Sequence, residues 1–393
     1  MIKNFDYFVP VKVIFGAGRL EETGTYVSQY GKKALIVTTG PFFKEIGLVD
    51  RIIKILEKSG VESAHFGDVS PNPFTNQVDA GAQFGKEFGC DVLIGLGGGS
   101  AIDAAKGIAI AIGHNAPVWD YCPSGDPGDL TATSKTLPII AITTTSGTGS
   151  HITPYAVITN PETKEKPGLG SDFTFPKVAI VDPELMLSVP SKITAATGFD
   201  VLAHAIEAYT STNSTPITDK MCEESIRLVG RYLRRVVENG KDLEARTALA
   251  YADTLSGFSI GVAVITLCHA ISHAVGGVSE TVHGESLAAM TPHTMRYSMN
   301  SLPEKYKNIG VFLRDECCCE ESEDGCNLES SVLEVEKLIN DLGLNIPLSK
   351  QGVKESDIEE IANGTIKYMA GALDNDPRKA SKQEIMDILR KSF

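Results

Sequence analysis

Residues 266–293 read T-L-C-H-A-I-S-H-A-V-G-G-V-S-E-T-V-H-G-E-S-L-A-A-M-T-P-H and hold four of the eight histidines in this 393-residue chain. His269 and His273 are four residues apart, so a helix would place both imidazoles on one face. Gly276-Gly277 is expected to end that helix, and His283 follows after a short polar loop.

A second pair of candidate ligands lies upstream, in T-G-F-D-V-L-A-H-A-I-E-A-Y. Asp200 and His204 are also four residues apart and would share a helical face. Three imidazoles and a carboxylate could converge on one divalent cation. The alternative is that each histidine is a satisfied core residue of an Ala-rich helix. On spacing alone both interpretations stay open, although so many histidines in a His-poor chain favour metal binding.

Composition restricts the class of protein. The hydrophobic share is 42% and the charged share 22%, which is ordinary for a globular protein long enough for two domains. A net charge of −14 argues against nucleic acid or an anionic membrane as the partner. The sequence shows no apolar run of transmembrane length and no signal-peptide core, so we expect a cytoplasmic protein.

Two local clusters call for an interpretation. The one basic cluster lies on a predicted amphipathic helix, where a solvated or subunit-contacting face is expected: Arg227, Arg231, Arg234 and Arg235. We expect a homo-oligomer, a dimer or larger. The cysteines at Cys317–Cys319 and Cys326 lack paired C-x-x-C spacing, so we interpret them as free thiols in a solvated loop.

Secondary-structure patterns divide the chain in two. Residues 1–183 alternate between strand and helix patterns, with helices such as Leu48–Ser59 and Val78–Phe88. The predicted strands are Val11–Phe15, Ala34–Val37, Ala64–Phe66, Val92–Leu96, Ile139–Thr143 and Val178–Val181. This alternation predicts a parallel, Rossmann-like α/β domain. Residues 184–393 show only helical periodicity, which predicts an all-α second domain.

The strongest motif of the first domain is V-L-I-G-L-G-G-G-S-A-I-D-A-A-K. A buried strand runs into Gly97, Gly98, Gly99 and Ser100, and the helix that follows carries Asp103. Glycines at such a junction let backbone N–H groups approach a pyrophosphate at the helix N-terminus. The alternative is a tight turn without a ligand, because this is not the G-x-G-x-x-G fingerprint.

A second polar turn, I-T-T-T-S-G-T-G-S-H, follows another predicted strand. Its hydroxyls come from Thr144, Thr145 and Thr148. They could contact a cofactor or simply cap the loop, and the sequence leaves both options open.

Together these residues resemble the iron-containing (group III) alcohol dehydrogenases over nearly the whole chain. The matching motifs are P-V-K-V-I-F-G-A-G, P-N-P, G-G-G-S-A-I-D-A-A-K, T-T-S-G-T-G-S, A-A-T-G-F-D-V-L-A-H-A-I-E-A-Y, C-H-A-I-S-H-A-V-G-G, V-H-G and D-N-D-P-R. The resemblance implies an N-terminal dinucleotide-binding domain and a helical, dehydroquinate synthase-like metal domain, with the active site between them.

The resemblance also assigns residues. The family's metal ligands fall on Asp200, His204, His269 and His283, and its non-ligating histidine falls on His273. Gly98 and Gly99, with Ser100 beside them, match pyrophosphate contacts, Asn72 matches a cofactor-contacting Asn, and Thr144, Thr145 and Thr148 match threonines of the cofactor cleft. The chain departs from the usual pattern at His151, Thr266, Val282 and Ser286-Leu287, so substrate preference cannot be carried over.

The implied reaction interconverts an alcohol with its aldehyde or ketone. A Lewis-acid metal, Fe(II) or Zn(II), lowers the pKa of the alcohol, and hydride passes to NAD or NADP. His273 could relay the proton. Two alternatives remain: a glycerol dehydrogenase-like or dehydroquinate synthase-like enzyme on the same fold, and a non-catalytic nucleotide-binding protein.

Cofactor preference is expected to depend on Thr39, at the end of A-L-I-V-T-T-G. NAD-preferring members commonly have Asp there, which binds the adenosine ribose and repels the 2′-phosphate of NADP. Thr39 is neutral, and Lys44 is the nearest downstream cation. We therefore predict that NADP is tolerated, with a mild preference for NADP(H). The alternative is that Thr39 only caps the turn.

Overall fold

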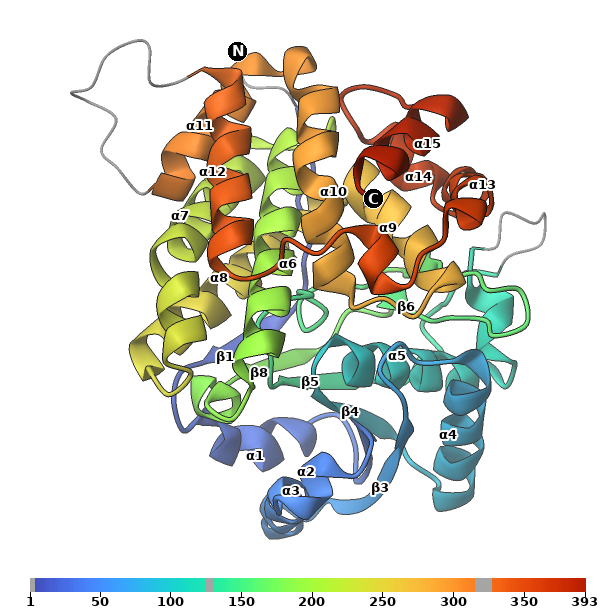
Figure 1. The fold of residues 1–393 in the computed structure, drawn as a ribbon. Coiled ribbons are helices and arrows are strands. Elements are labelled where there is room, and N and C mark those ends of the chain that lie inside the picture. Colours follow the sequence, from blue (N-terminus) through green and yellow to red (C-terminus); the bar gives the residue numbers. More distant parts are fainter. Residues whose placement is uncertain (1–3, 124–129, 315–326) are drawn as a thin grey trace. The chain divides into compact units, whose positions relative to one another are not determined.

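The computed structural model describes residues 4–123, 130–314 and 327–393, which form two compact units (Figure 1). The α/β unit comprises Val9–Thr145 and Ser150–Met186. The helical unit comprises Leu187–Phe393 together with the short segments Met1–Phe8 and Ser146–Gly149. The cysteine cluster at residues 317–326 lies outside the described residues, whereas Cys90, Cys122, Cys222 and Cys268 are buried free thiols.

A six-stranded parallel sheet forms the centre of the α/β unit, in the order β1-β8-β5-β4-β2-β3. The strands are β1 (Lys12–Phe15), β2 (Lys33–Thr39), β3 (Glu62–Val69), β4 (Val92–Gly97), β5 (Ile139–Thr143) and β8 (Val178–Val181). The helices between them are α1 (Thr23–Val27), α2 (Phe42–Glu45), α3 (Leu48–Lys58), α4 (Thr75–Phe88) and α5 (Gly99–His114). All six predicted strands are present.

Alternation along the strands explains why both faces of this sheet are covered. In β2, Leu35 and Val37 belong to one apolar cluster, whereas Ala34 and Ile36 belong to another on the opposite face. Residues of α4 and α5 complete the first cluster, and residues of α1 and α3 complete the second. The near-continuous apolar runs of the strands follow from this burial on both faces.

The strand order reverses between β2 and β4. From β2 the chain moves outward to β3, then returns to β4 on the other side and continues through β5 to β8. In open α/β sheets, ligands bind beyond the carboxyl ends of the strands at such a reversal. The turns after Thr39 and after Gly97 therefore occupy the position expected of a nucleotide site. A two-stranded antiparallel ladder, β6 (Ala156–Val157) with β7 (Gly168–Leu169), was not predicted.

The helical unit has a core of its own, and within its described residues it contains no strand. Its longer helices are α6 (Ser191–Thr210), α7 (Pro216–Glu238), α8 (Leu243–Ala263), α9 (Leu267–Val278), α10 (His283–Ser298), α11 (Pro303–Arg314) and α12 (Leu328–Asp341). The chain ends with α13 (Ile358–Tyr368), α14 (Ala370–Asp374) and α15 (Lys382–Lys391). The predicted fold class, a parallel α/β domain followed by an all-α domain, is confirmed.

One predicted helix boundary is wrong. Gly276-Gly277 does not end the helix that carries His269, because α9 continues through both glycines to Val278. Ser279 then leaves the helix with φ −132°. Glycine permits a left-handed terminus but does not require one, and neither glycine of this pair has a positive φ.

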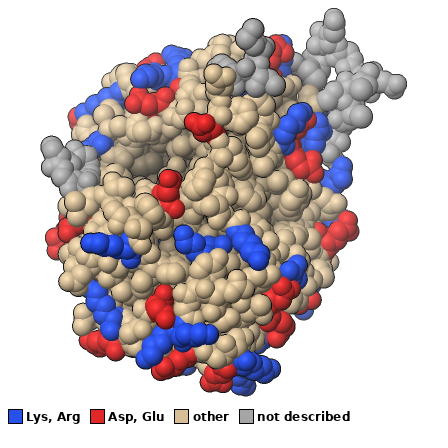
Figure 2. All heavy atoms as spheres, turned by 180° about the vertical axis from the view of Figure 1, so that it is seen from behind, with Lys and Arg blue, Asp and Glu red and all other residues tan. Residues whose placement is uncertain are grey.

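Within the described part of the chain, no single helix is long and apolar enough to cross a membrane. The pair α8 and α9 reaches the required length only when joined across a bend of 98°. On the face drawn in Figure 2, lysine and arginine side chains are interspersed with aspartate and glutamate. Two of the predicted basic residues pair within the helical unit, Arg234 with Asp341 and Arg235 with Asp242.

Candidate metal and cofactor sites

Three helices of the helical unit carry the predicted metal ligands. Asp200 and His204 lie one turn apart on α6, His269 lies in the first turn of α9, and His283 is the first residue of α10. The i,i+4 spacing read from the sequence thus places the α6 pair on one helical face. The short loop between α9 and α10 returns His283 toward His269.

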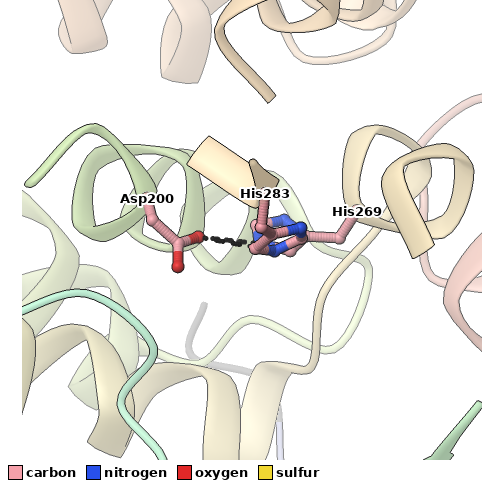
Figure 3. A group of neighbouring side chains, drawn as sticks. All are labelled: Asp200, His269 and His283. Atoms are coloured by element: carbon pink, nitrogen blue, oxygen red, sulfur yellow. Dashed lines mark hydrogen bonds and ion pairs between the residues drawn. The ribbon is translucent and has the colours of Figure 1, made fainter. Parts of the chain in front are cut away.

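Asp200, His269 and His283 form a group whose ligand atoms all lie within 4.8 Å of one another (Figure 3). Nε2 of His269 lies 3.2 Å from Oδ1 of Asp200, and Nε2 of His283 lies 3.8 Å from the same oxygen. Asp200 and His269 are buried, whereas His283 is partly exposed. Three of the four predicted ligands therefore converge.

The fourth predicted ligand, His204, lies beside this group but is not a member of it. Its ring stacks on the ring of His269 with a centroid separation of 4.3 Å. Its Nδ1 lies 3.5 Å from Oδ1 of Asp200 and 3.2 Å from the carbonyl oxygen of Gly147.

His273 is buried one helical turn beyond His269. Its ring centroid lies 6.4 Å from that of His269 and 5.7 Å from that of His283, with edge-to-face geometry in both pairs. Its side chain is thus close to the group of ligands without being part of it.

Two buried carboxylates dominate the electrostatics of the group. Burial by itself would lower the pKa of His269, but Glu207 and Asp200 together raise it. Burial would likewise raise the pKa of Glu207, and the adjacent His269 ring and backbone donors lower it. His204 differs, because burial outweighs Asp200 and lowers its pKa to about 4. The site therefore favours a positive charge beside Asp200 and Glu207, with a neutral His204 ring.

This donor set fits a divalent transition metal. Imidazole nitrogens with one carboxylate oxygen suit Fe(II) and Zn(II), whereas Ca²⁺ and Mg²⁺ prefer oxygen ligands alone. A metal binding at His269 would take the place of the proton that the two carboxylates attract.

At the carboxyl end of β4, the chain turns sharply into α5. Gly97 has φ +147°, a conformation that side-chain-bearing residues rarely adopt. A Cβ at Gly98 would lie 3.0 Å from Oγ1 of Thr145, so glycine lets these two turns approach closely without displacing the threonine side chain. No side chain caps the N-terminus of α5, whose first turn includes Gly99 and Ser100. Free backbone N–H groups at a helix N-terminus favour a phosphate.

The other predicted cofactor residues of the α/β unit gather around the same turn. The backbone N–H of Thr144 donates to the carbonyl of Gly97 at 3.0 Å. The backbone N–H of Asn72 donates to the hydroxyl of Ser100 at 3.3 Å, and Asn72 has a left-handed φ of +59°. Thr148 belongs to the turn Ser146–Gly149, which is part of the helical unit.

Asp103 and Thr39 have more specific surroundings. Asp103 is buried, and its carboxylate accepts hydrogen bonds from the hydroxyl of Ser150 at 2.5 Å and from the backbone of Val157 at 3.1 Å. Thr39 ends β2 and is registered against Asp68 of β3 through a bulge. No local pattern predicts that an acidic residue of the neighbouring strand lies beside Thr39.

Several residues near the two sites were not predicted. Glu207 contacts His269, Ser272 contacts Nδ1 of His283, and the ammonium group of Lys166 lies 2.7 Å from the side-chain oxygen of Asn72. The signal for Glu207 was present, because it is an acidic residue on the apolar helix of Asp200 and His204. Lys166 carried no such signal, because it lies in an irregular segment 94 residues from Asn72.

Comparison with known proteins identifies the family. Residues 10–183 match the model described as iron-containing alcohol dehydrogenase, and residues 194–393 match that of the Fe-containing alcohol dehydrogenase family, C-terminal. The 1,3-propanediol dehydrogenase of Klebsiella pneumoniae is 37% identical over 100% of this chain and 99% of its own length. The NAD-dependent methanol dehydrogenase of Bacillus methanolicus is 34% identical over 99% of this chain and 100% of its own length.

Solved structures agree. The crystal structure of an archaeal halo-thermophilic alcohol dehydrogenase from a Red Sea brine pool has a TM-score of 0.95 at 41% identity and full coverage of both chains. The sulfoacetaldehyde reductase of Bifidobacterium kashiwanohense, in complex with NAD⁺, has a TM-score of 0.85 at 29% identity and covers 99% of each chain. The chain belongs to the iron-containing alcohol dehydrogenase family. It is an alcohol dehydrogenase, an oxidoreductase that interconverts an alcohol and its carbonyl product.

Proposed function

We propose that this chain interconverts a small primary alcohol or diol with its aldehyde, using a nicotinamide dinucleotide and one divalent metal ion. The observation that carries the proposal is the convergence of Asp200, His269 and His283 within 4.8 Å, in a chain of this family. The substrate class is inferred from relatives named for 1,3-propanediol and methanol.

The metal is proposed to be Fe(II), with Zn(II) as the alternative, held by Asp200, His269, His283 and His204. His204 is proposed as the fourth ligand because its ring stacks on that of His269 at 4.3 Å and its Nδ1 lies 3.5 Å from Oδ1 of Asp200. When bound, the metal supplies Lewis acidity to the alcohol oxygen and the nicotinamide accepts hydride. His273 is proposed to receive the alcohol proton, because it is buried next to the ligands and is not one of them.

The dinucleotide is proposed to bind at the reversal of strand order. The N-terminus of α5, with Gly97, Gly98, Gly99 and Ser100, would hold the pyrophosphate through backbone N–H groups. Asn72, Thr144, Thr145 and Thr148 would contact the rest of the cofactor. The internal hydrogen bonds of Asp103 favour a supporting role, in which it holds the segment around Ser150 against α5.

Cofactor choice is proposed to depend on Thr39. A neutral residue there leaves out one group that would repel a 2′-phosphate, so NADP should be tolerated beside NAD. Asp68 opposes this effect from the neighbouring strand, because it is exposed and registered against Thr39. We further propose that the active form is a homo-oligomer, which light scattering would test.

The central experiment loads purified protein with Fe(II) under anaerobic conditions, or with Zn(II), and measures metal content and turnover. Methanol, propanol and 1,3-propanediol, with the matching aldehydes, are assayed with NAD(H) and NADP(H). We expect one metal per chain, alcohol-dependent reduction of the cofactor, and loss of both metal and activity in His269→Ala. Full metal occupancy in His269→Ala would contradict the ligand assignment.

The same assay separates the alternatives. A non-catalytic nucleotide-binding protein would bind the cofactor without turnover, and a glycerol dehydrogenase-like enzyme would act on glycerol and poorly on 1-propanol. Thr39→Asp should lower the catalytic efficiency with NADPH more than that with NADH. Asp68→Asn should raise the catalytic efficiency with NADPH. A wild type that strongly prefers NADH and is indistinguishable from Thr39→Asp would refute the role of Thr39.

A further inference from the structure

Glu207 is a buried carboxylate that no step of the proposed reaction uses. It lies on α6, three residues beyond His204, and both of its oxygens accept hydrogen bonds from α9 and the residue before it. Oε2 accepts from the backbone of Thr266 at 2.7 Å and lies 2.9 Å from Nδ1 of His269. Oε1 accepts from the backbone of His269 at 2.9 Å.

The contact with Nδ1 determines which nitrogen His269 presents to the metal group. A carboxylate can only accept, so Nδ1 must carry the proton in this hydrogen bond. Nε2 points the other way, 3.2 Å from Oδ1 of Asp200. Because that carboxylate also only accepts, Nε2 carries a proton when no metal is bound, and a metal at Nε2 would take the place of this proton. An anionic partner at Nδ1 also increases the basicity of the ring at Nε2.

The other two imidazoles hydrogen-bond to neutral groups at Nδ1, although Nδ1 of His204 also lies 3.5 Å from Oδ1 of Asp200, itself a proposed ligand. His204 faces the carbonyl of Gly147 at 3.2 Å, and His283 faces the hydroxyl of Ser272 at 3.0 Å. Ser272 is itself 2.7 Å from the hydroxyl of Ser286, whose hydrogen bond to the carbonyl of His283 closes this chain of contacts. His269 is therefore held by a charge-assisted hydrogen bond to a carboxylate that lies outside the group of proposed ligands.

Glu207 also stabilises the start of α9. The side chain of the N-cap residue, Thr266, makes no capping hydrogen bond. The backbone N–H groups of Thr266 and His269, which capping would otherwise have to satisfy, donate instead to Glu207. The preceding turn contains Val264 at φ 63° and ψ 170°, a region populated almost only by glycine. The Glu207 bonds help to hold this unfavourable turn in place.

We propose that Glu207 is a positioning residue for the metal site: it fixes the tautomer of His269 and the first turn of α9, so that Nε2 faces Asp200. This inference rests on the proposed function, because it presupposes that the group of ligands binds a metal. Residues that act in this way typically contribute about 10–100-fold to metal affinity.

The test compares metal affinities, with no need for turnover. The dissociation constants for Zn²⁺ and Co²⁺ are measured by competition with a chromogenic chelator in wild type, Glu207→Gln, Ser272→Ala and Glu336→Gln. Glu207→Gln keeps the shape of the side chain and removes its charge. We expect it to weaken metal binding roughly 10–100-fold. Ser272→Ala should weaken it less, because it removes a neutral partner.

Glu336→Gln is the matched control. Glu336 lies on α12, where its carboxylate pairs with the guanidinium group of Arg296 at 2.6 Å, away from the proposed metal ligands. It should bind metal as the wild type does. A folded Glu207→Gln with wild-type affinity would overturn the inference, whereas a wild type that binds no metal would overturn the proposed function instead.

A second measurement covers the case in which Glu207→Gln does not fold. In zinc-loaded wild type with ¹⁵N-labelled histidine, His269 should show a hydrogen-bonded proton on Nδ1 and metal-bound Nε2. A proton on Nε2 of His269 would overturn the inference without any variant.

Discussion

At the scale of single residues, Val264 is the clearest conflict between side chain and backbone. It follows α8 with φ 63° and ψ 170°, although its branched Cβ disfavours positive φ. Such conformations cost about 1–3 kcal/mol and persist only where the surrounding structure enforces them. The bonds that enforce it come from α6 and the residue that follows it: Glu207 holds Thr266, and the hydroxyl of Ser211 donates to the carbonyl of Ala263 at 2.6 Å.

We therefore predict that Val264→Gly stabilises the protein. The free energy of unfolding should rise by roughly 1 kcal/mol, because the relief of strain exceeds the entropic cost of glycine. Urea unfolding of the metal-free wild type and variant measures this change in the free energy of unfolding. The control is Val262→Gly, inside α8, which should lose about 1 kcal/mol. Equal destabilisation by both substitutions would show that Val264 is not strained.

His273 yields the second prediction at this scale. His273→Ala should keep the metal, because His273 is not among the converging ligands, and should lower turnover by roughly 10²-fold or more. The loss should depend on pH, since the variant lacks the group that takes the proton. Turnover as a function of pH, with metal content measured on the same samples, provides the check. A profile parallel to that of the wild type would leave His273 with a packing role only.

At the scale of secondary-structure elements, two buried charged side chains of α5, Asp103 and Lys106, fasten this helix to the segment around Ser150. Lys106 is fully buried, and its ammonium group donates to the carbonyls of Ser150, Thr153 and Tyr155 at 2.7, 2.9 and 2.6 Å. Burial lowers the pKa of Lys106 to about 8, although Asp103 opposes the shift. These bonds hold residues 150–155 of the α/β unit close to the helix that begins at the proposed pyrophosphate site.

Removal of this lysine should be costly. Lys106→Met leaves three buried carbonyls without their donor and removes the cation that offsets the charge of Asp103, so the free energy of unfolding should fall by about 3–5 kcal/mol. Lys86→Met is the control, because Lys86 is exposed and donates to the side chain of Asn115 at 2.8 Å. Denaturant titration of both variants would distinguish the two cases, and a loss no larger than that of Lys86→Met would contradict the role of the pair.

The same variant has a pH signature. Lys106 releases its proton at about pH 8 in the folded protein and only near 10.5 when unfolded. Between these two pH values the unfolded state binds more protons than the folded state at this lysine. The contribution of Lys106 to the free energy of unfolding therefore increases as the pH rises. The difference in free energy of unfolding between wild type and Lys106→Met should therefore increase from about pH 8 to about pH 10.5. A difference that stays constant over this range would contradict the lowered pKa of Lys106.

At the scale of the whole molecule, the two units have separate cores and separate proposed ligands. The proposed metal joins α6, α9 and α10, all within the helical unit. The proposed pyrophosphate site lies in the α/β unit, at the turn between β4 and α5. A ligand that binds only the folded state stabilises it by mass action, by about 2.7 kcal/mol at 100 times its dissociation constant.

Removal of the metal should therefore destabilise the helical unit more than the α/β unit. Chelation should speed hydrogen exchange at the amides of α6, α9 and α10, while the amides of β4 and β5 keep their protection. Exchange measured by mass spectrometry with and without Zn²⁺ tests this, with His269→Ala as the control that should not respond. If Zn²⁺ slowed exchange in His269→Ala as much as in the wild type, the stabilising metal would bind at another site.

The local signals in the sequence determined most of the fold. Apolar runs predicted all six strands of the large sheet, and helical periodicity predicted that no strand follows residue 183. Spacing also determined that Asp200 shares a helical face with His204, and His269 with His273, because an α-helix repeats about every 3.6 residues. These features depend on neighbours within one or two turns. The boundary at Gly276-Gly277 failed because glycine allows a terminus and leaves the choice to the surrounding packing.

Only the tertiary structure decided which distant residues meet. Strand order, and with it the reversal between β2 and β4, depends on pairing between segments that carry similar apolar patterns. Glu207 reaches His269 across 62 residues, and Lys106 reaches Ser150 across 44. Both side chains lie in largely apolar helices, where burial leaves a charged group with few partners. The partner it finds depends on how the helices pack, which no local pattern contains.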